Sequence, residues 1–268
     1  MQSIFLFFSA ILASMPMTLF GQHYSGHLEI LAFNQNLGDD SVIYYLKDAH
    51  KRWRLLEGAL EAKAMDRFKS GDRVAIEGSV FNEDSLIVDQ ITRLNEPQGQ
   101  TFPDIRRALF MVVDFTDKKA SMNYSKDQLQ QVIYGNQDSV NTFFNQVSLG
   151  KTSFAQDADN DGEVDITAPL NLNIPASCDV YTVATAAEEQ ATIAGYDLSI
   201  FQHRVFVLPP MQDCGWGGVA NVGCTSGCRA WLAAPNIVYN YTHELGHNLG
   251  LGHAGFHGEE YGDFSDPM

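Results

Sequence analysis

Apolar and polar side chains follow two different patterns in the two halves of the chain. Between residues 26 and 93 they alternate with a period of two, in short runs broken by Gly-Asp and Asn-Glu-Asp turns. This alternation is typical of half-buried strands. It predicts a small all-β barrel. The expected strands span residues 26–33, 41–47, 52–57, 72–80 and 84–93.

The second half has longer apolar runs and helical spacing. The runs 106–115 and 203–210 predict strands buried on both faces of a sheet. Ser125 can cap a helix that opens near Lys126, Gly150 can end its continuation, and a second helix is expected at about 181–194. Residues 151–170 have a hairpin-like pattern. The fold class expected is a small all-β barrel, which resembles the oligonucleotide- and oligosaccharide-binding (OB) barrels, followed by an α+β or α/β domain with a mixed sheet.

Two segments outside these patterns set the boundaries. Residues 4–20 are apolar and uncharged, with Pro16 inside and Gly21 after, which is typical of a cleaved secretory signal peptide over residues 1–21. A membrane anchor is the alternative, although the run is short for a bilayer and its leader lacks Lys and Arg. The Pro- and Gly-containing stretch 95–104 indicates a linker. The predicted units are a barrel at 22–97, a linker at 98–104 and a larger domain at 105–268.

The charge and the cysteine content limit which classes of binding partner and which cellular compartment the sequence suggests. The net charge is −16, made up of −4 for residues 22–97 (9 basic, 13 acidic) and −12 for residues 98–268 (8 basic, 20 acidic). Nucleic-acid binding would need a basic face, so the acidic balance of both halves argues against a nucleic-acid partner. An even number of cysteines in an exported chain predicts two disulfides, with a structural zinc site as the rival and the pairing left open. The cysteines are Cys178, Cys214, Cys224 and Cys228.

The stretch HELGHNLGLGH, residues 243–253, carries the clearest chemistry. His243 and His247 are one helical turn apart, so both imidazoles can reach one metal ion, while Glu244 can reach the water beside it. Gly250 permits a sharp turn at the helix end that brings His253 back to the ion. Three neutral imidazoles with one open position predict a catalytic zinc site.

This HExxHxxGxxH pattern resembles the metzincin metallopeptidases, and the SDPM run ending in Met268, with GWGGVANVG upstream, resembles their gametolysin-like branch. The resemblance implies a secreted zinc endopeptidase in which Glu244 handles the proton of the attacking water. It also implies a methionine turn at Met268 beneath the metal. An edge strand would pair with extended substrate, and its nominated residues are Trp216, Gly217, Gly218 and Val219.

Known metzincins continue beyond their methionine turn, whereas this sequence stops at Met268, so we expect a fragment of a longer peptidase. The amino-terminal barrel is either an inhibitory prodomain or a retained accessory domain. It contains no cysteine, so a cysteine on the metal is not its means of inhibition. An extracellular binding or adhesion protein with a vestigial peptidase domain is the alternative function. The sequence is silent on the oligomeric state.

A second group of metal-type side chains lies in the run DADNDGEVD. Asp157, Asp159 and Asp161, followed by Gly162, match the first half of a calcium loop, and Asp165 stands at its ninth position. The twelfth position is Ala168, where such loops have glutamate. The run therefore predicts either a calcium site or an acidic hairpin tip without an ion.

Overall fold

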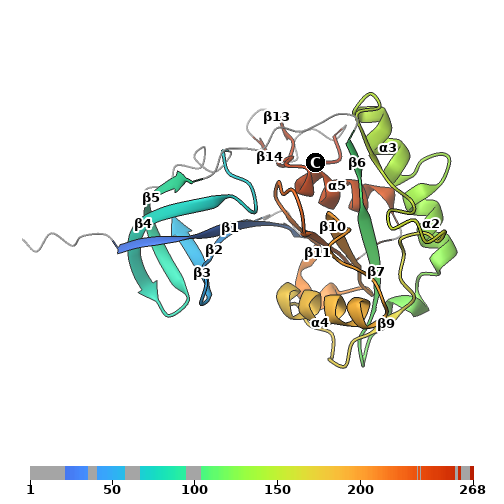
Figure 1. Cartoon of the computed structure of the whole chain (residues 1–268), viewed down its shortest axis with the longest axis horizontal. Coiled ribbons are helices and arrows are strands. Elements are labelled where there is room, and N and C mark those ends of the chain that lie inside the picture. Colours follow the sequence, from blue (N-terminus) through green and yellow to red (C-terminus); the bar gives the residue numbers. More distant parts are fainter. Residues whose placement is uncertain are drawn as a thin grey trace, which may run out of the picture.

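The structure, a computed structural model, describes residues 22–35, 41–57, 67–94, 104–233, 235, 237–256, 259–260 and 266–268. The predicted signal peptide and nearly all of the predicted linker lie outside these residues. Figure 1 shows strands β2 to β5 at one end of the molecule, the helices and the remaining strands at the other, and β1 running between them.

The amino-terminal strands pair in a closed ring. The pairs are β1 with β2, β2 with β3, β3 with β5, β5 with β4, and β4 with β1. Buried side chains alternate with exposed ones along β4, as the sequence pattern requires, and Val74 and Ile76 belong to the enclosed core. The strands are β1 (Gln22–Gln35), β2 (Ser41–Lys47), β3 (Arg52–Glu57), β4 (Arg73–Asn82) and β5 (Ser85–Arg93).

Five further strands continue from β1 in the order β1-β11-β12-β10-β7-β9, and together with the ring they form one ten-stranded sheet. Neighbours β12, β10 and β7 run parallel and β11 runs antiparallel to β12, so the prediction of a mixed sheet is confirmed. Every residue of β7 is buried, as expected for a strand covered on both faces. The strands are β7 (Ala108–Asp114), β9 (Leu170–Asn171), β10 (His203–Val207), β11 (Trp216–Asn221) and β12 (Cys228–Leu232).

Helices cover the two faces of this sheet (Figure 1). Helix α4 packs with one core cluster, and helices α2, α3 and α5 pack with a second cluster on the opposite face. Short 3-10 turns lie at Ala120–Met122 and Gln212–Cys214. Among the described residues the helices are α2 (Lys126–Tyr134), α3 (Val140–Val147), α4 (Val180–Ile193) and α5 (Val238–Asn248). None of them is both long and apolar enough to cross a bilayer.

Two local predictions need correction. The helix expected from Lys126 towards Gly150 is two helices, because Gly135 ends α2 and Ser139 begins α3 with its own capping box. The hairpin expected at 151–170 does not form, since its two strands pair with different partners. Strand β8 (Thr152–Phe154) runs parallel to β6 (Asp104–Arg106), and β9 runs parallel to β7. A small pair, β13 (Gly255–Phe256) with β14 (Glu259–Glu260), follows α5.

Both disulfides lie near β11. Cys178 bonds to Cys214 and ties the start of α4 to the turn before β11. Cys224 bonds to Cys228 and closes the connection from β11 to β12. The predicted pair of disulfides is therefore present, and the pairing left open by the sequence is fixed.

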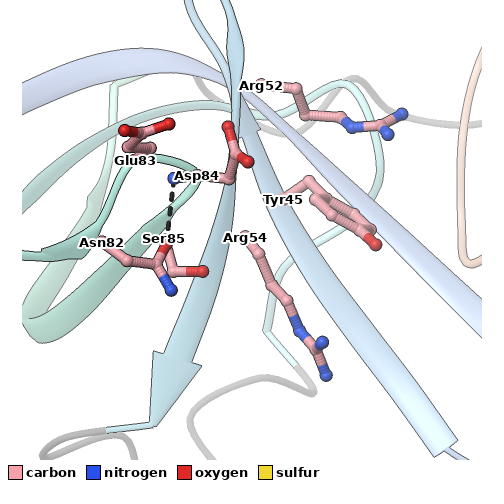
Figure 2. Close-up of a pocket in the computed structure, with 7 residues that line it drawn as sticks. All are labelled: Tyr45, Arg52, Arg54, Asn82, Glu83, Asp84 and Ser85. Atoms are coloured by element: carbon pink, nitrogen blue, oxygen red, sulfur yellow. Dashed lines mark hydrogen bonds between the residues drawn. The ribbon is translucent and has the colours of Figure 1, made fainter.

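On the α4 side, the junction between the ring and the rest of the sheet is held by aromatic and cationic contacts. The guanidinium of Arg52 lies 4.6 Å from the ring centre of Tyr45 and 3.3 Å from that of Tyr181 on α4. Figure 2 shows Arg52 and Tyr45 beside a shallow hollow of about 700 Å³ that also includes Arg54 and the turn before β5. Since Arg52 already stacks on Tyr181, its positive charge stabilises this junction through cation–π contacts.

Candidate metal centre

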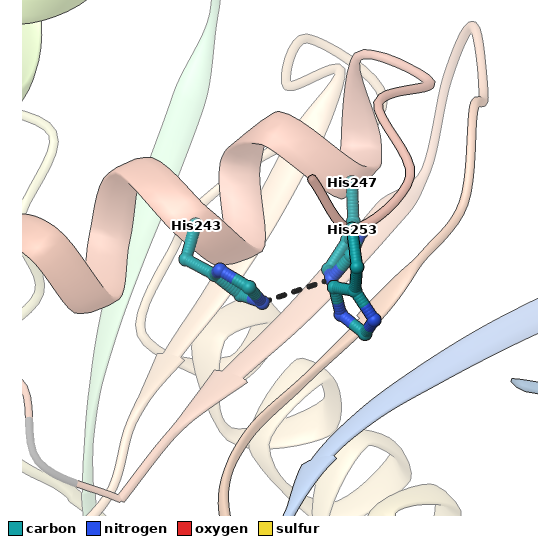
Figure 3. Close-up of side chains that lie close together, drawn as sticks. All are labelled: His243, His247 and His253. Atoms are coloured by element: carbon teal, nitrogen blue, oxygen red, sulfur yellow. Dashed lines mark hydrogen bonds between the residues drawn. The ribbon is translucent and has the colours of Figure 1, made fainter. Parts of the chain in front are cut away.

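Helix α5 places two of the motif histidines inside the protein. His243 and His247 lie one turn apart on the same face, and their side chains are 0% and 1% exposed. The helix ends just after Asn248, where Gly250 takes a φ of +95°, the left-handed conformation that glycine adopts without strain. This turn brings His253 back beside the helix (Figure 3).

The three imidazoles converge through their Nε2 atoms. Nε2 of His247 lies 3.1 Å from Nε2 of His243 and 3.0 Å from Nε2 of His253. Three nitrogens bound at about 2.0–2.1 Å to one tetrahedral zinc ion would lie about 3.3 Å from one another. The histidine cluster, meaning His243, His247 and His253, therefore has nearly the spacing that one shared zinc ion requires.

The opposite ring nitrogens show which tautomer is present. Nδ1 of His243 lies 2.6 Å from the carbonyl oxygen of Pro267, and Nδ1 of His247 lies 2.9 Å from that of Leu251. A carbonyl oxygen can only accept, so each Nδ1 carries the proton and donates. The Nε2 lone pairs of the neutral rings consequently point at one another, and a cation between them would replace this repulsion with bonding.

Burial also favours the neutral ring that a metal needs. Desolvation lowers the pKa of His247 to about 3, and the repulsion that a protonated His243 would exert acts in the same direction. A histidine with such a pKa stays unprotonated at neutral pH, with its Nε2 lone pair available. A donor set of three imidazole nitrogens fits zinc.

Glu244 lies beside the cluster on the same helix and is 1% exposed. Its carboxylate packs directly against the backbone of Gly218 in β11, where any side chain atom would overlap Oε1. The sequence nominated Gly218 as part of a substrate strand. The structure shows a different reason for a glycine at this position, which is that any side chain would overlap the Glu244 carboxylate.

The expectation that β11 has an open edge for substrate is wrong. Trp216–Asn221 does not lie at an edge, because β12 pairs with one side of it and β1 with the other. The β1 register places Leu31 opposite Asn221, Ala32 opposite Ala220 and Phe33 opposite Val219. A substrate strand cannot add to β11 while β1 occupies this position.

Met268 packs beneath the motif helix. Its side chain is 4% exposed, and its sulfur lies so close to Gly246 that a Cβ there would overlap it. The same segment supplies the Pro267 carbonyl that accepts from His243, and the Met268 carbonyl accepts from the amide of Ala254. Sequence analysis missed Gly246 and Pro267. A glycine inside a helix, which costs about 1 kcal/mol relative to alanine, was the available signal for Gly246.

A buried polar group anchors the end of α5 to the sheet. Asn248, fully buried, donates from Nδ2 to the carbonyl oxygens of Asn221 and Arg229, and its Oδ1 lies 3.0 Å from Nδ1 of His203. Burial lowers the pKa of His203 to about 4, so this histidine is neutral and its Nδ1–H donates to Asn248. Sequence analysis did not connect His203 with the motif.

The predicted calcium residues form a separate group, the aspartate loop, around Asp157, Asp159 and Asp161. One carboxylate oxygen from each lies within 4.8 Å of the others. Asp157 accepts from the amides of Asp161 and Gly162, and Asp165 accepts from Ala158. Burial, with a further contribution from the loop carboxylates, raises the pKa of Asp165 to about 7. Calcium binding here stays a prediction.

A buried three-histidine cluster with an adjacent glutamate is the kind of site that a metallopeptidase uses. The chain matches the family described as Gametolysin peptidase M11 over residues 107–268, more than half of its length. The chain therefore belongs to the gametolysin peptidase M11 family, and the resemblance seen in the sequence is confirmed. Membership places it among the metallopeptidases, which act on polypeptides and imply a metal ion.

The similarity to individual proteins is more limited. A stretch of 102 residues is 36% identical to the autolysin of Chlamydomonas reinhardtii, covering 34% of this chain and 16% of that protein. The chain thus spans only a small part of this relative. The solved structure of YjeQ from Thermotoga maritima aligns over 75% of this chain and 73% of its own with 8% identity, but its TM-score of 0.26 is too low to indicate a shared fold.

Proposed function

We propose that the protein is a secreted zinc endopeptidase whose ion is held by His243, His247 and His253. The observation that carries the proposal is the convergence of the three Nε2 atoms, with Nδ1 of His243 and Nδ1 of His247 each held on a backbone carbonyl oxygen. Zinc at this position would supply Lewis acidity, lowering the pKa of a water it holds and polarising the scissile carbonyl. A protein environment that orients imidazoles in this way supports a resident ion over a chance cluster.

Glu244 is the proton carrier in this proposal. Its carboxylate adjoins the cluster on α5 and is shielded from solvent, so it can accept the proton of the attacking water and pass it to the leaving amine. Gly218 keeps the space beside the carboxylate clear. Asn248 and the Pro267 carbonyl hold the helix end and the His243 ring in place, which limits the reorganisation needed during the reaction.

Replacing the carboxylate while keeping the metal tests this role. Glu244→Gln should retain one zinc per chain by elemental analysis and lose about 10²- to 10⁴-fold in kcat on a quenched-fluorescent peptide. Glu189→Gln, an exposed change on α4, is the matched control and should keep full activity. Near-normal hydrolysis by Glu244→Gln would remove Glu244 from the mechanism. Absence of stoichiometric zinc in the wild type would remove the metal assignment.

Export is the second part of the proposal. Two disulfides are typical of chains that fold in an oxidising compartment, and they support a secreted protein. The predicted signal peptide agrees with this. Amino-terminal sequencing of protein recovered from culture medium tests it, and we expect cleavage between residues 14 and 22.

We further infer that the amino-terminal ring is an OB-type barrel at 22–97, followed by the peptidase domain at 105–268. The strand circuit β1-β2-β3-β5-β4-β1, with parallel β3 and β5, supports this assignment.

A further inference from the structure

A cavity of about 480 Å³ joins the histidine cluster to the amino-terminal barrel. On one side it is bounded by His247 and His253, the two ligands nearest the end of α5. On the other it is bounded by a barrel wall, which consists of Ile30, Ala32, Val42, Tyr44, Phe68 and Lys69. Because the cavity shares two imidazoles with the metal centre, a molecule that fills it also contacts the centre.

The barrel wall is fixed in place by backbone pairing. Along β1, Leu31 and Phe33 point to the α4 side of the sheet, whereas Ile30 and Ala32 point to the cavity on the opposite face, where α5 lies. The amide of Val222 donates to the Ile30 carbonyl, and the amide of Ser70 donates to the Val222 carbonyl, each at 2.9 Å. Strand β1 therefore continues the floor of the cleft outward from β11. Figure 3 draws a blue ribbon, the colour of the first strands, beside the histidines.

The chemistry of the wall defines what fits. Five of its six side chains are apolar or aromatic, and the sixth, Lys69, is an exposed cation. Burying an apolar side chain against them is favourable by about 25 cal/mol for each Å² removed from water, while a carboxylate placed among them would lose its hydration without a buried partner. The cavity volume falls in the range of specific ligand pockets, about 300–1,000 Å³.

We propose that the amino-terminal barrel forms part of the substrate cleft, and that its wall selects polypeptides with a bulky apolar side chain close to the bond that is cleaved. This inference rests on the proposed peptidase function. It assigns substrate-binding residues to a part of the chain outside the segment matched by the peptidase family. It also gives a use to the pairing of β1 with β11, since that pairing holds the barrel wall against the metal centre.

A charge placed on the wall tests the proposal in the full chain. Val42→Lys alters a wall side chain that is 43% exposed, and Val80→Lys is the matched control, since Val80 is 50% exposed on β4 of the same barrel away from the cavity. The substrates are quenched-fluorescent peptides that differ only in carrying Leu, Phe or Glu at successive positions around the cleaved bond. We expect Val42→Lys to lower kcat/KM for the Leu or Phe peptides about tenfold at one position and to raise it for Glu there. Val80→Lys should match the wild type.

Binding without turnover provides the second readout. In the Glu244→Gln background, fluorescence anisotropy should show the same tenfold weakening of Leu and Phe peptides by Val42→Lys. Identical selectivity of the Val42 and Val80 variants would overturn the proposal while leaving the peptidase function intact. A uniform gain in turnover for all peptides would also overturn it, because the barrel would then be a cover. Selective binding without hydrolysis would contradict the peptidase function but support the assignment of the barrel wall to the binding cleft. Absence of both binding and hydrolysis would contradict both proposals.

Discussion

The histidine cluster and the aspartate loop each bring the ligand atoms of three metal-binding side chains within 4.8 Å of one another. They differ in whether those ligand atoms already accept hydrogen bonds from the protein. In the aspartate loop, Asp157 and Asp161 accept backbone amides of the loop itself, so the loop is stabilised without an ion. In the histidine cluster, the carbonyl contacts turn the lone pairs of His243 and His247 towards each other. Proximity alone therefore does not define a metal site. The other partners of the ligand atoms decide whether an ion is needed.

The largest expected contrast is in metal content. His247→Ala removes the central ligand, so zinc per chain should fall from one towards zero and peptide cleavage should fall by at least about 10³-fold. Asp159→Asn should leave both quantities within about twofold of the wild type. Elemental analysis and a peptide assay on the same preparations measure this. Equal loss in the two variants would erase the distinction between the sites.

A buried imidazole outside the cluster should show itself in the pH dependence of stability. His203 has a folded pKa of about 4 against about 6.5 when unfolded, because burial penalises its charged form, while the nearby ion pair of Arg106 and Asp104 acts on it in opposite directions. The unfolded state binds more protons between these values. The stabilisation is complete above pH 6.5 and is lost as pH falls through 4, in total on the order of 3 kcal/mol.

His203→Gln keeps a donor for Asn248 and removes this titration. The free energy of unfolding of the wild type minus that of the variant should fall by on the order of 3 kcal/mol from pH 7 to pH 4. Urea unfolding at a series of pH values measures the difference. Every other ionisable side chain is the same in the two proteins, so its contribution cancels in the difference. A difference that stays constant with pH would show that His203 is not a neutral buried ring.

Replacing a glycine by alanine should lower the stability of the protein in both regions, but for different reasons. Gly246→Ala places a methyl group against the Met268 sulfur and should cost about 1–3 kcal/mol of stability. Gly162→Ala meets open space, but its φ of +89° strains any side chain, by about 1 kcal/mol. Urea unfolding of both variants checks this, with Gly246→Ala combined with Met268→Ala as the control. If the second change recovers none of the loss, the overlap is not its cause.

The histidine cluster was predictable from the sequence because all three histidines lie within eleven consecutive residues. Helical periodicity brings His243 next to His247, and a glycine at the helix end brings back His253. Likewise, the strands Ser41–Lys47 and Arg52–Glu57 were predicted to the residue, since each is a short run with several apolar and aromatic residues that directly follows a polar segment.

Contacts between distant segments were not predictable in the same way. The pairing of Leu31 with Asn221 depends on where the barrel docks, and both strands carry patterns that suit several partners. The link from His203 through Asn248 to the motif helix joins residues with no shared periodicity. The hairpin expected at 151–170 was wrong for a related reason, because its two strands pair in parallel with two other strands, β8 with β6 in a separate two-stranded sheet and β9 with β7.

The smallest expected effect concerns calcium in the aspartate loop. Since the loop is already held by its own hydrogen bonds, the ion should add only its binding energy, about 1.4 kcal/mol at ten times the dissociation constant. Thermal or urea unfolding with and without calcium measures this gain. Asp159→Asn should abolish it, whereas Glu163→Gln removes the same charge from the same loop outside the carboxylate group and should preserve it. A gain that survives in Asp159→Asn would place the ion elsewhere. No gain at millimolar calcium would make the loop an acidic turn that needs no ion, and would leave the histidine cluster as the one metal centre among the described residues.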